Sequence, residues 1–236
     1  TREHETGLTF RQIESNTAFE VSGLGAAQDD IVVPDVYRGL PVIRIGDKAF
    51  YNKNTVTSVS LGGNIREIGA QAFLGCSALK SITLSEGLLT IGDQAFQSCR
   101  ALESALTLPD SVTSIGAQAF EYCRALPSVT FGGKLASIGT KAFNGCSALT
   151  SVLVPDNVKS LGDGAFSACS ALSSVTLGSG ITAIGTDTFL RCTSLTAFNA
   201  GANVQSIGDY AFAESTALAA VTIGDNVRST GTTGFY

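Results

Sequence analysis

A repeat of 23 residues runs through most of the chain and constrains its fold more than any other feature. Its clearest mark is a phenylalanine that returns nine times; seven of the eight intervals are 23 residues long and one is 24. These residues are Phe50, Phe73, Phe96, Phe120, Phe143, Phe166, Phe189, Phe212 and Phe235. A fixed period of about 20 to 50 residues is typical of solenoids, in which each unit stacks on its neighbours. The sequence therefore predicts one elongated array rather than separate globular domains.

Each unit divides into three pieces. The first alternates apolar and polar residues, as in LKSITL at 79–84, and predicts a strand with one buried face. The second, such as VTSI at 112–115, predicts a shorter strand. The third runs from a glycine through Ala-Phe to a cysteine, as in residues 92–99, and its apolar spacing predicts a brief helical turn. Gly92 at its start is expected to permit a tight bend or a positive φ.

Residues 1–40 do not fit the repeat and are predicted to form an N-terminal β cap, with short strands near residues 8–10, 17–21 and 31–34. Solenoids need such an atypical unit to cover the first rung. Residues 41–236 then form an array of about eight repeats and a partial ninth. No polar unit is recognisable at the C-terminal end. We therefore expect either that the natural protein continues or that this open edge gives weak self-association.

Six cysteines occur once per unit, three residues after the repeated phenylalanine, in place of the close pairs typical of zinc sites. A disulfide between stacked rungs would distort them, because the side chains run parallel. Cysteine also packs well as a small buried residue. The pattern favours buried free thiols at Cys76, Cys99, Cys123, Cys146, Cys169 and Cys192.

Charge and composition exclude several classes of function. The net charge is −5 and basic runs are missing, which argues against nucleic-acid binding. No apolar run is long enough to span a membrane as a helix. The sequence shows no signal peptide, but it lacks an initial Met, so we expect a trimmed or mature product and do not infer a cytoplasmic location.

Residues suited to catalysis are scarce. The only histidine, His4, lies in a charged leader, so Ser-His-Asp and Cys-His arrangements are excluded. Asp110 and Asp156 follow prolines at turn positions two rungs apart, which makes a paired acid and base improbable. We predict that the chain is not an enzyme and needs no metal or cofactor.

The repeat resembles a known family. Residues 79–88 resemble the LxxLxLxxxL segment of leucine-rich repeats, and the complete unit with IGxxAFxxC resembles the BspA-like class of 23-residue leucine-rich repeats. This resemblance covers residues 41–236. It implies a right-handed α/β-type solenoid with a parallel β ladder on its concave face and short helices or a second strand on the other side. It also implies a cell-surface, secreted or periplasmic protein of a host-associated microbe, with a role in adhesion and virulence. The family defines no catalytic residues and no ligand motif.

Outward positions of the first strand form a ladder of small, mostly hydroxylated side chains, and solenoids commonly bind proteins through such a face. We predict that it binds a protein partner, such as a host extracellular protein, with the centre near Thr130 and Leu153. The candidate binding residues are Ser81, Thr83, Thr107, Ser128, Thr130, Ser151, Leu153, Ser174 and Thr176.

Other interpretations of this ladder remain open. Small β-forming residues also fit a crowded inner curve without any binding role. The array could be a structural spacer that presents another domain, or an ice- or glycan-binding ladder. Ice binding is disfavoured because the ladder mixes Ser, Ala, Leu and Asn on a face that should curve. The extra residue of the 24-residue unit lies within residues 103–105; we favour a neutral insertion at the start of the strand over a functional bulge.

Overall fold

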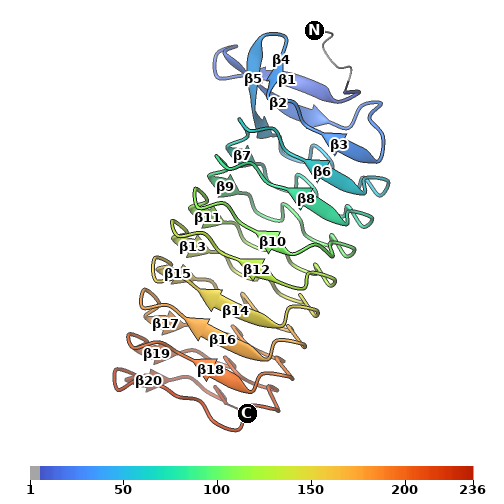
Figure 1. Ribbon diagram of the computed structural model, residues 1–236. Helices are drawn as coiled ribbons and strands as arrows, with labels where there is room; N and C mark the ends of the chain where they lie inside the picture. Colours follow the sequence, from blue (N-terminus) through green and yellow to red (C-terminus); the bar gives the residue numbers. More distant parts are fainter. Residues whose placement is uncertain (1–5, 236) are drawn as a thin grey trace.

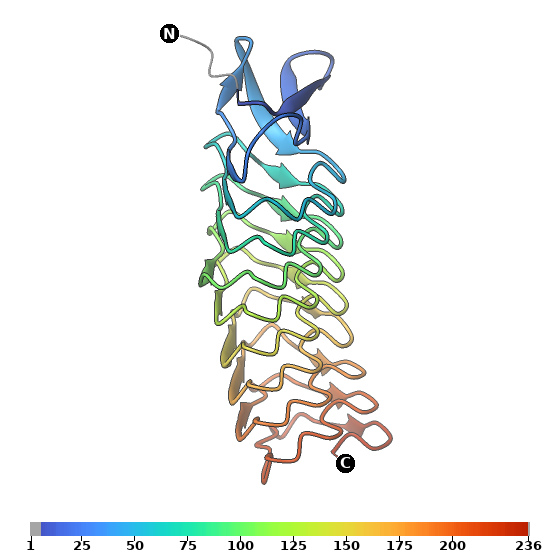
Figure 2. The same ribbon diagram turned by 90° about the vertical axis from the view of Figure 1, so that its right-hand side faces the viewer.

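The computed structural model describes residues 6–235, which form an elongated solenoid (Figures 1 and 2). Two sets of parallel strands run along different sides of it, with like positions of successive repeats paired in register. This confirms the predicted stack of repeats. The first strand of a repeat has two to four residues, and the second strand has two. His4 lies outside the described residues.

The first strands of the repeats carry the predicted binding ladder. They are β6 (Ser58–Ser60), β8 (Ser81–Thr83), β10 (Leu106–Thr107), β12 (Val129–Thr130), β14 (Ser151–Val154), β16 (Ser174–Leu177) and β18 (Ala197–Asn199).

The second strands form the more continuous ladder, in which β5 (Leu40–Ile45), β7, β9, β11, β13 and β15 pair without a break. They are β7 (Glu67–Ile68), β9 (Thr90–Ile91), β11 (Ser114–Ile115), β13 (Ser137–Ile138), β15 (Ser160–Leu161), β17 (Ala183–Ile184), β19 (Ser206–Ile207) and β20 (Ser229–Thr230).

The third piece of each repeat is a chain of turns, so the predicted short helices are wrong: residues 6–235 contain no helix. The amides of Gln94, Phe96 and Ser98 donate to carbonyl oxygens of the next rung, over N···O distances of 2.7–2.8 Å. Gln94 and Ser98 have φ angles of 56° and 62°, in the left-handed region that ends a helix. The same spacing that suggested a helical turn therefore buries Ala95, Phe96 and Cys99 from a β-solenoid corner.

Gly92 has a reason other than the predicted positive φ. A Cβ atom there would lie 2.7 Å from the backbone nitrogen of Ala70 in the rung before, too close for any side chain. The repeated glycine is thus required by the close approach of successive rungs, while the positive φ falls two residues later, on Gln94.

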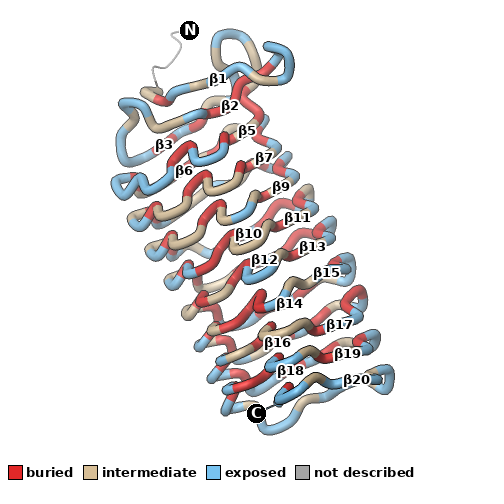
Figure 3. Tube along the Cα trace, turned by 180° about the vertical axis from the view of Figure 1, so that it is seen from behind, coloured by how far each residue is buried: buried red, intermediate tan, exposed pale blue. Residues whose placement is uncertain are grey.

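The core is a column of stacked phenylalanine rings that runs the length of the array. Successive centroids lie 5.0–5.9 Å apart, with planes within 13° of parallel. Phe131 and Phe198 add edge-on contacts from the first strands. Figure 3 shows that buried segments recur in each rung, while the turns between them are largely exposed. Because each buried side chain packs against the same type of residue in the next rung, the sequence repeats closely.

The six cysteines are buried free thiols in this structure, as the sequence predicts. Each thiol donates to the carbonyl oxygen of the phenylalanine in the rung before, as Cys146 does to Phe120 over 3.2 Å. Ser215 stands where a seventh cysteine is expected, is also buried, and donates to Phe189 over 2.8 Å. The cysteine column is therefore a set of hydrogen-bonded core positions.

The N-terminal segment contains β1 (Thr9–Ile13), β2 (Ala18–Gly23), β3 (Asp30–Val32), β4 (Val36–Tyr37) and β5 (Leu40–Ile45). β1 and β2 form an antiparallel hairpin, but β2 continues the second ladder through β5, and β3 continues the first ladder through β6. β5 spans the predicted boundary between residues 40 and 41. That division into a cap and an array remains a prediction.

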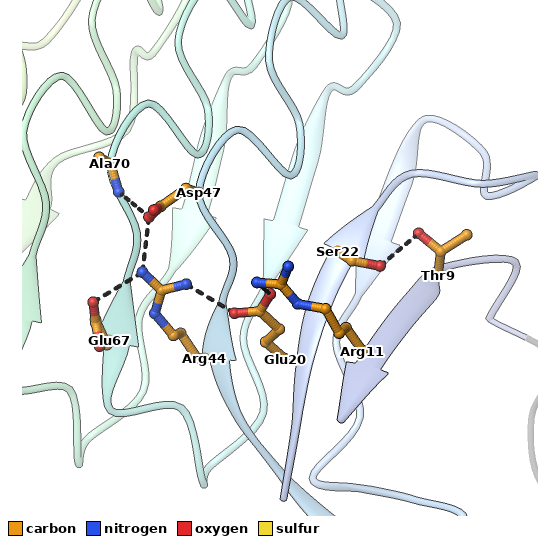
Figure 4. Close-up of polar contacts among 8 residues, drawn as sticks. All are labelled: Thr9, Arg11, Glu20, Ser22, Arg44, Asp47, Glu67 and Ala70. Atoms are coloured by element: carbon orange, nitrogen blue, oxygen red, sulfur yellow. Dashed lines mark hydrogen bonds and ion pairs between the residues drawn. The ribbon is translucent and has the colours of Figure 1, made fainter. Parts of the chain in front are cut away.

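An ion-pair cluster fastens this segment to the first rungs (Figure 4). Glu20 is 2% exposed and pairs with Arg44 at 2.8 Å and with Arg11. Arg44 also contacts Asp47 at 2.7 Å and Glu67 at 3.1 Å. Burial lowers the pKa of Arg44, but the carboxylates of Glu20, Asp47 and Glu67 together raise the pKa by more. The guanidinium therefore stays charged. The cluster joins strands β1, β2, β5 and β7.

Candidate interaction face

The ladder face is the outward side of the first strands, where side chains of successive rungs are aligned by the strand register. Ser60 pairs with Thr83, Thr107 with Thr130, and Leu153 with Thr176. Of the predicted binding residues, three are half-buried: Ser81, Ser128 and Ser174. The other six are exposed: Thr83, Thr107, Thr130, Ser151, Leu153 and Thr176. The structure thus places all nine on one side, and their role in binding remains a prediction.

This ladder is divided into three paired segments, which the sequence did not predict. β3, β6 and β8 form one, β10 and β12 the next, and β14, β16 and β18 the third. The first break lies at the extra residue within 103–105. The second break, between β12 and β14, lies between repeats of 23 residues. A break therefore does not require an extra residue, and the neutral insertion stays a prediction.

Each break coincides with a hollow on the ladder face. The hollow between β12 and β14 has a volume of about 640 Å³ and is lined by Thr130, Phe131, Leu153, Pro155, Asp156 and Thr176, among others. We call it the Leu153 hollow. It coincides with the predicted centre of binding near Thr130 and Leu153.

The second hollow lies between β8 and β10 and has a volume of about 440 Å³. Its lining includes Thr83, Leu84, Glu86, Thr107, Pro109 and Asp110. We call it the acidic hollow, because both of its charged lining residues are carboxylates.

Leu153, which is 67% exposed, offers an apolar contact near the middle of the face. Its register partner Thr176 and neighbouring Thr130 surround it with hydroxyl groups. Ser128, Thr130 and the buried Phe131 also line the Leu153 hollow. A hollow lined by an exposed leucine is suited to an apolar side chain of a partner.

Sequence reasoning missed one rung of this face. Asp30 pairs with Ser58 and Val32 with Ser60, so β3 adds a further rung before β6. Val32 is 66% exposed, comparable with Leu153. Hydroxyl hydrogen bonds from Ser58 and Thr57 lower the pKa of Asp30. The strand at 31–34 was visible in the sequence, but its pairing partner was not, so it was assigned to the cap alone.

The repeated aspartates have a structural use that explains their turn positions. Asp110 accepts the amide of Gly133 over 3.1 Å, and Asp156 accepts that of Ser179 over 2.7 Å. This bond is the main reason that the pKa of Asp156 is lowered. Each carboxylate thus joins its own rung to the next, which supports the prediction that these residues are not a catalytic pair.

Glu121 is the most buried carboxylate outside the N-terminal cluster, at 3% exposure. Its oxygens accept amide hydrogens from Gln97, Gln118 and Asn144 over 2.5–2.7 Å. This network joins three rungs on the side formed by the turns, away from the ladder face. It satisfies the buried carboxylate without a cation. Among residues 6–235, no group of three or more His, Cys, Asp or Glu is arranged to hold a metal ion.

The C-terminal edge has a hollow of about 320 Å³ lined by Phe212, Leu218, Val221, Ile223 and Phe235, among others. Ile223 is 41% and Phe235 44% exposed. The self-association expected at this edge remains a prediction.

Comparisons with known proteins agree on the fold. A family model described as the BspA type leucine rich repeat region, in six copies, matches residues 43–135 and 113–236. A leucine-rich repeat protein of T. pallidum, TpLRR, has a similar structure, with a TM-score of 0.66, 28% identity, and 91% of this chain and 89% of that one covered. The pneumococcal vaccine antigen PcpA has a TM-score of 0.65 at 19% identity, with 96% of this chain and 78% of its own covered. No curated protein matches the chain. In the described part of the chain, no helix could cross a membrane.

Proposed function

Because the chain belongs to the BspA-type leucine-rich repeat family, we propose that it is an adhesion module that binds a protein partner through the ladder face. The family is generally a non-enzymatic interaction fold. The observation that carries the proposal is the Leu153 hollow, where a leucine that is 67% exposed lines the same hollow as Ser128, Thr130, Ser151 and Thr176. A partner that covered Leu153 would bury apolar surface.

The proposed location is the cell surface. Secretion and a periplasmic location are alternatives that also place the protein outside the cytoplasm. The similar protein PcpA is described as a pneumococcal vaccine antigen. A host extracellular protein is the kind of partner that this location would provide. Adhesion to the host, and a contribution to virulence, form part of the proposal.

The test compares two double variants against purified host extracellular-matrix proteins by surface plasmon resonance. Thr130→Glu with Leu153→Glu places two charges at the centre of the ladder face. Ala136→Glu with Thr182→Glu places two charges at exposed positions beside the second strands and serves as the matched control. The first variant should weaken binding about tenfold or more, because it removes the apolar contact and buries charge. The control should stay within about twofold.

Both variants should keep the stability of the unchanged protein to within about half a kcal/mol, since all four positions are exposed. If a bound protein tolerates the ladder-face variant but not the control variant, the proposed face is wrong. If no protein binds the unchanged chain, a structural spacer becomes the better account.

A further inference from the structure

The Leu153 hollow and the acidic hollow of the ladder face differ in chemistry, and this difference bears on what the face binds. A third, smaller hollow over β16 and β18, of about 320 Å³, has no charged lining residue. The inference rests on the proposed function. The acidic hollow is lined by Glu86 and Asp110 on neighbouring rungs, and its lining contains no Lys or Arg. The Leu153 hollow lies further along the same face and offers an exposed leucine.

Neither carboxylate of the acidic hollow is neutralised by the protein. Within residues 6–235, ion pairs are formed by Arg11, Arg44 and Arg191 with other acids, and none involves Glu86 or Asp110. Both residues are exposed. The bond from the Gly133 amide fixes the Asp110 carboxylate in place. Two adjacent, unpaired carboxylates attract a cationic group.

Asp156, which lines the Leu153 hollow, has a different environment. The charge of nearby Lys159 contributes to lowering the pKa of its carboxyl group, after the larger effect of the Ser179 amide. The negative charge at the Leu153 hollow is therefore offset in part, and the acidic hollow is the stronger site for a cation.

The spacing of the hollows defines the shape of an occupant. Glu86, Asp110 and Leu153 belong to the second, third and fifth repeats. Rungs of a β ladder lie about 4.8 Å apart, so the hollows are separated by roughly 10–14 Å along the solenoid. An extended peptide rises about 3.3 Å per residue and presents every second side chain to the same side. Residues i and i+4 then lie about 13 Å apart on one face of the peptide.

We propose that the ladder face binds an extended peptide segment in which a lysine or arginine lies four positions before or after an apolar residue. The basic side chain occupies the acidic hollow between Glu86 and Asp110, and the apolar side chain covers Leu153. The intervening residues lie over Thr107 and Thr130, whose hydroxyls bond to the peptide. Neither hollow alone fixes the register; the pair does.

The test uses the probe peptide acetyl-Lys-Thr-Ser-Thr-Leu-amide and follows the methyl resonances of Thr83, Thr107, Thr130 and Leu153 in an NMR titration. Two further peptides serve as comparisons: one has Glu in place of Lys, and the other places Leu two positions from Lys. The matched variants are Glu86→Gln with Asp110→Asn, and Leu153→Thr. The Asp110→Asn change keeps a side-chain oxygen that can accept the Gly133 amide, so the rungs stay joined.

The probe should shift these methyl signals and lose about five- to tenfold in affinity against either variant. The Glu peptide should bind still more weakly. Binding of the probe should also fall as salt rises from about 0.05 M to about 0.5 M, because an exposed charge contact is screened.

Equal affinity for the Glu86→Gln, Asp110→Asn variant, equal affinity for the Glu peptide, or no binding up to the solubility limit would each overturn this inference. The proposed function has a separate test. A protein partner could lose affinity for the Thr130→Glu, Leu153→Glu variant while the probe peptide binds the Glu86→Gln, Asp110→Asn variant as well as the unchanged protein. In that case the ladder face is a binding face, but it does not recognise this peptide motif. If neither the binding of the partner nor the binding of the probe changes in these variants, both the proposed function and this inference are wrong.

Discussion

Truncation of Phe143 to Ala should be among the most damaging single changes to this chain. The ring is fully buried and stacks between Phe120 and Phe166 at 5.2 and 5.4 Å. Phe131 adds an edge-on contact at 5.7 Å. Loss of a buried phenylalanine costs about 3–5 kcal/mol, and aromatic pairs contribute about 0.5–1.5 kcal/mol each beyond their buried area. We therefore expect the free energy of unfolding to fall by about 4–5 kcal/mol.

The assay is a urea titration followed by far-ultraviolet circular dichroism. Two controls bracket the result. Phe235→Ala should cost only about 1–2 kcal/mol, because Phe235 is 44% exposed and stacks on one ring, Phe212, among the described residues. Leu153→Ala should stay within about half a kcal/mol. A loss below about 1 kcal/mol for Phe143→Ala, or one no larger than for Phe235→Ala, would refute the account of a continuous stacked core.

Three further predictions concern the thiols, the N-terminal cluster and the C-terminal edge. Native protein should resist a thiol reagent, and all six thiols should react after denaturation without reductant. Burial raises the pKa of Cys76 from 9.0 to about 12, so the thiol ionises at lower pH in the unfolded chain than in the folded one. The free energy of unfolding should therefore fall as the pH rises from 9.0 towards 12. Fewer than six reactive thiols, or a flat profile above pH 9.0, would count against buried neutral thiols. Arg44→Ala should cost about 3–5 kcal/mol in a urea titration because it removes the better-buried partner of Glu20, whereas Arg11→Ala should cost less than about 1 kcal/mol; equal costs would contradict this. Light scattering should show mass rising with concentration, an effect that Ile223→Glu suppresses, and a monomer at high concentration would exclude self-association through the last rungs.

The period of the repeat was sufficient to predict the core, because one buried residue per rung must repeat if rungs stack. Phe143 and Cys146 illustrate this: both are fully buried, as their phasing indicated. The conformation of the third piece was not predictable in the same way. Ala95, Phe96 and Cys99 show a spacing that fits a helical turn, but backbone bonds to the next rung replace bonds within the piece. Periodicity reports which side chains are buried and not where amides donate.

The candidate site was predicted in part. Alternation correctly placed Thr130 and Leu153 outward, since strand side chains alternate between faces. The breaks in the ladder depend on pairing between rungs. The pattern within one repeat contains no information about that pairing. The place of Val32 on this ladder was not predictable for the same reason. Its strand β3 pairs with β6 across residues 33–57, which contain no strand of this ladder. The contacts of Glu121 with three amides were also invisible, since they join residues of three different repeats.

The most direct test of the central claim is methyl cross-saturation from a bound protein partner. Irradiation of the partner should transfer saturation to the methyl groups of Thr130, Leu153 and Thr176 on the ladder face. The methyl groups of Ala136 and Thr182, beside the second strands, should keep their intensity. Transfer to Ala136 and Thr182 with none to Leu153 would contradict the claim that this solenoid binds through its ladder face.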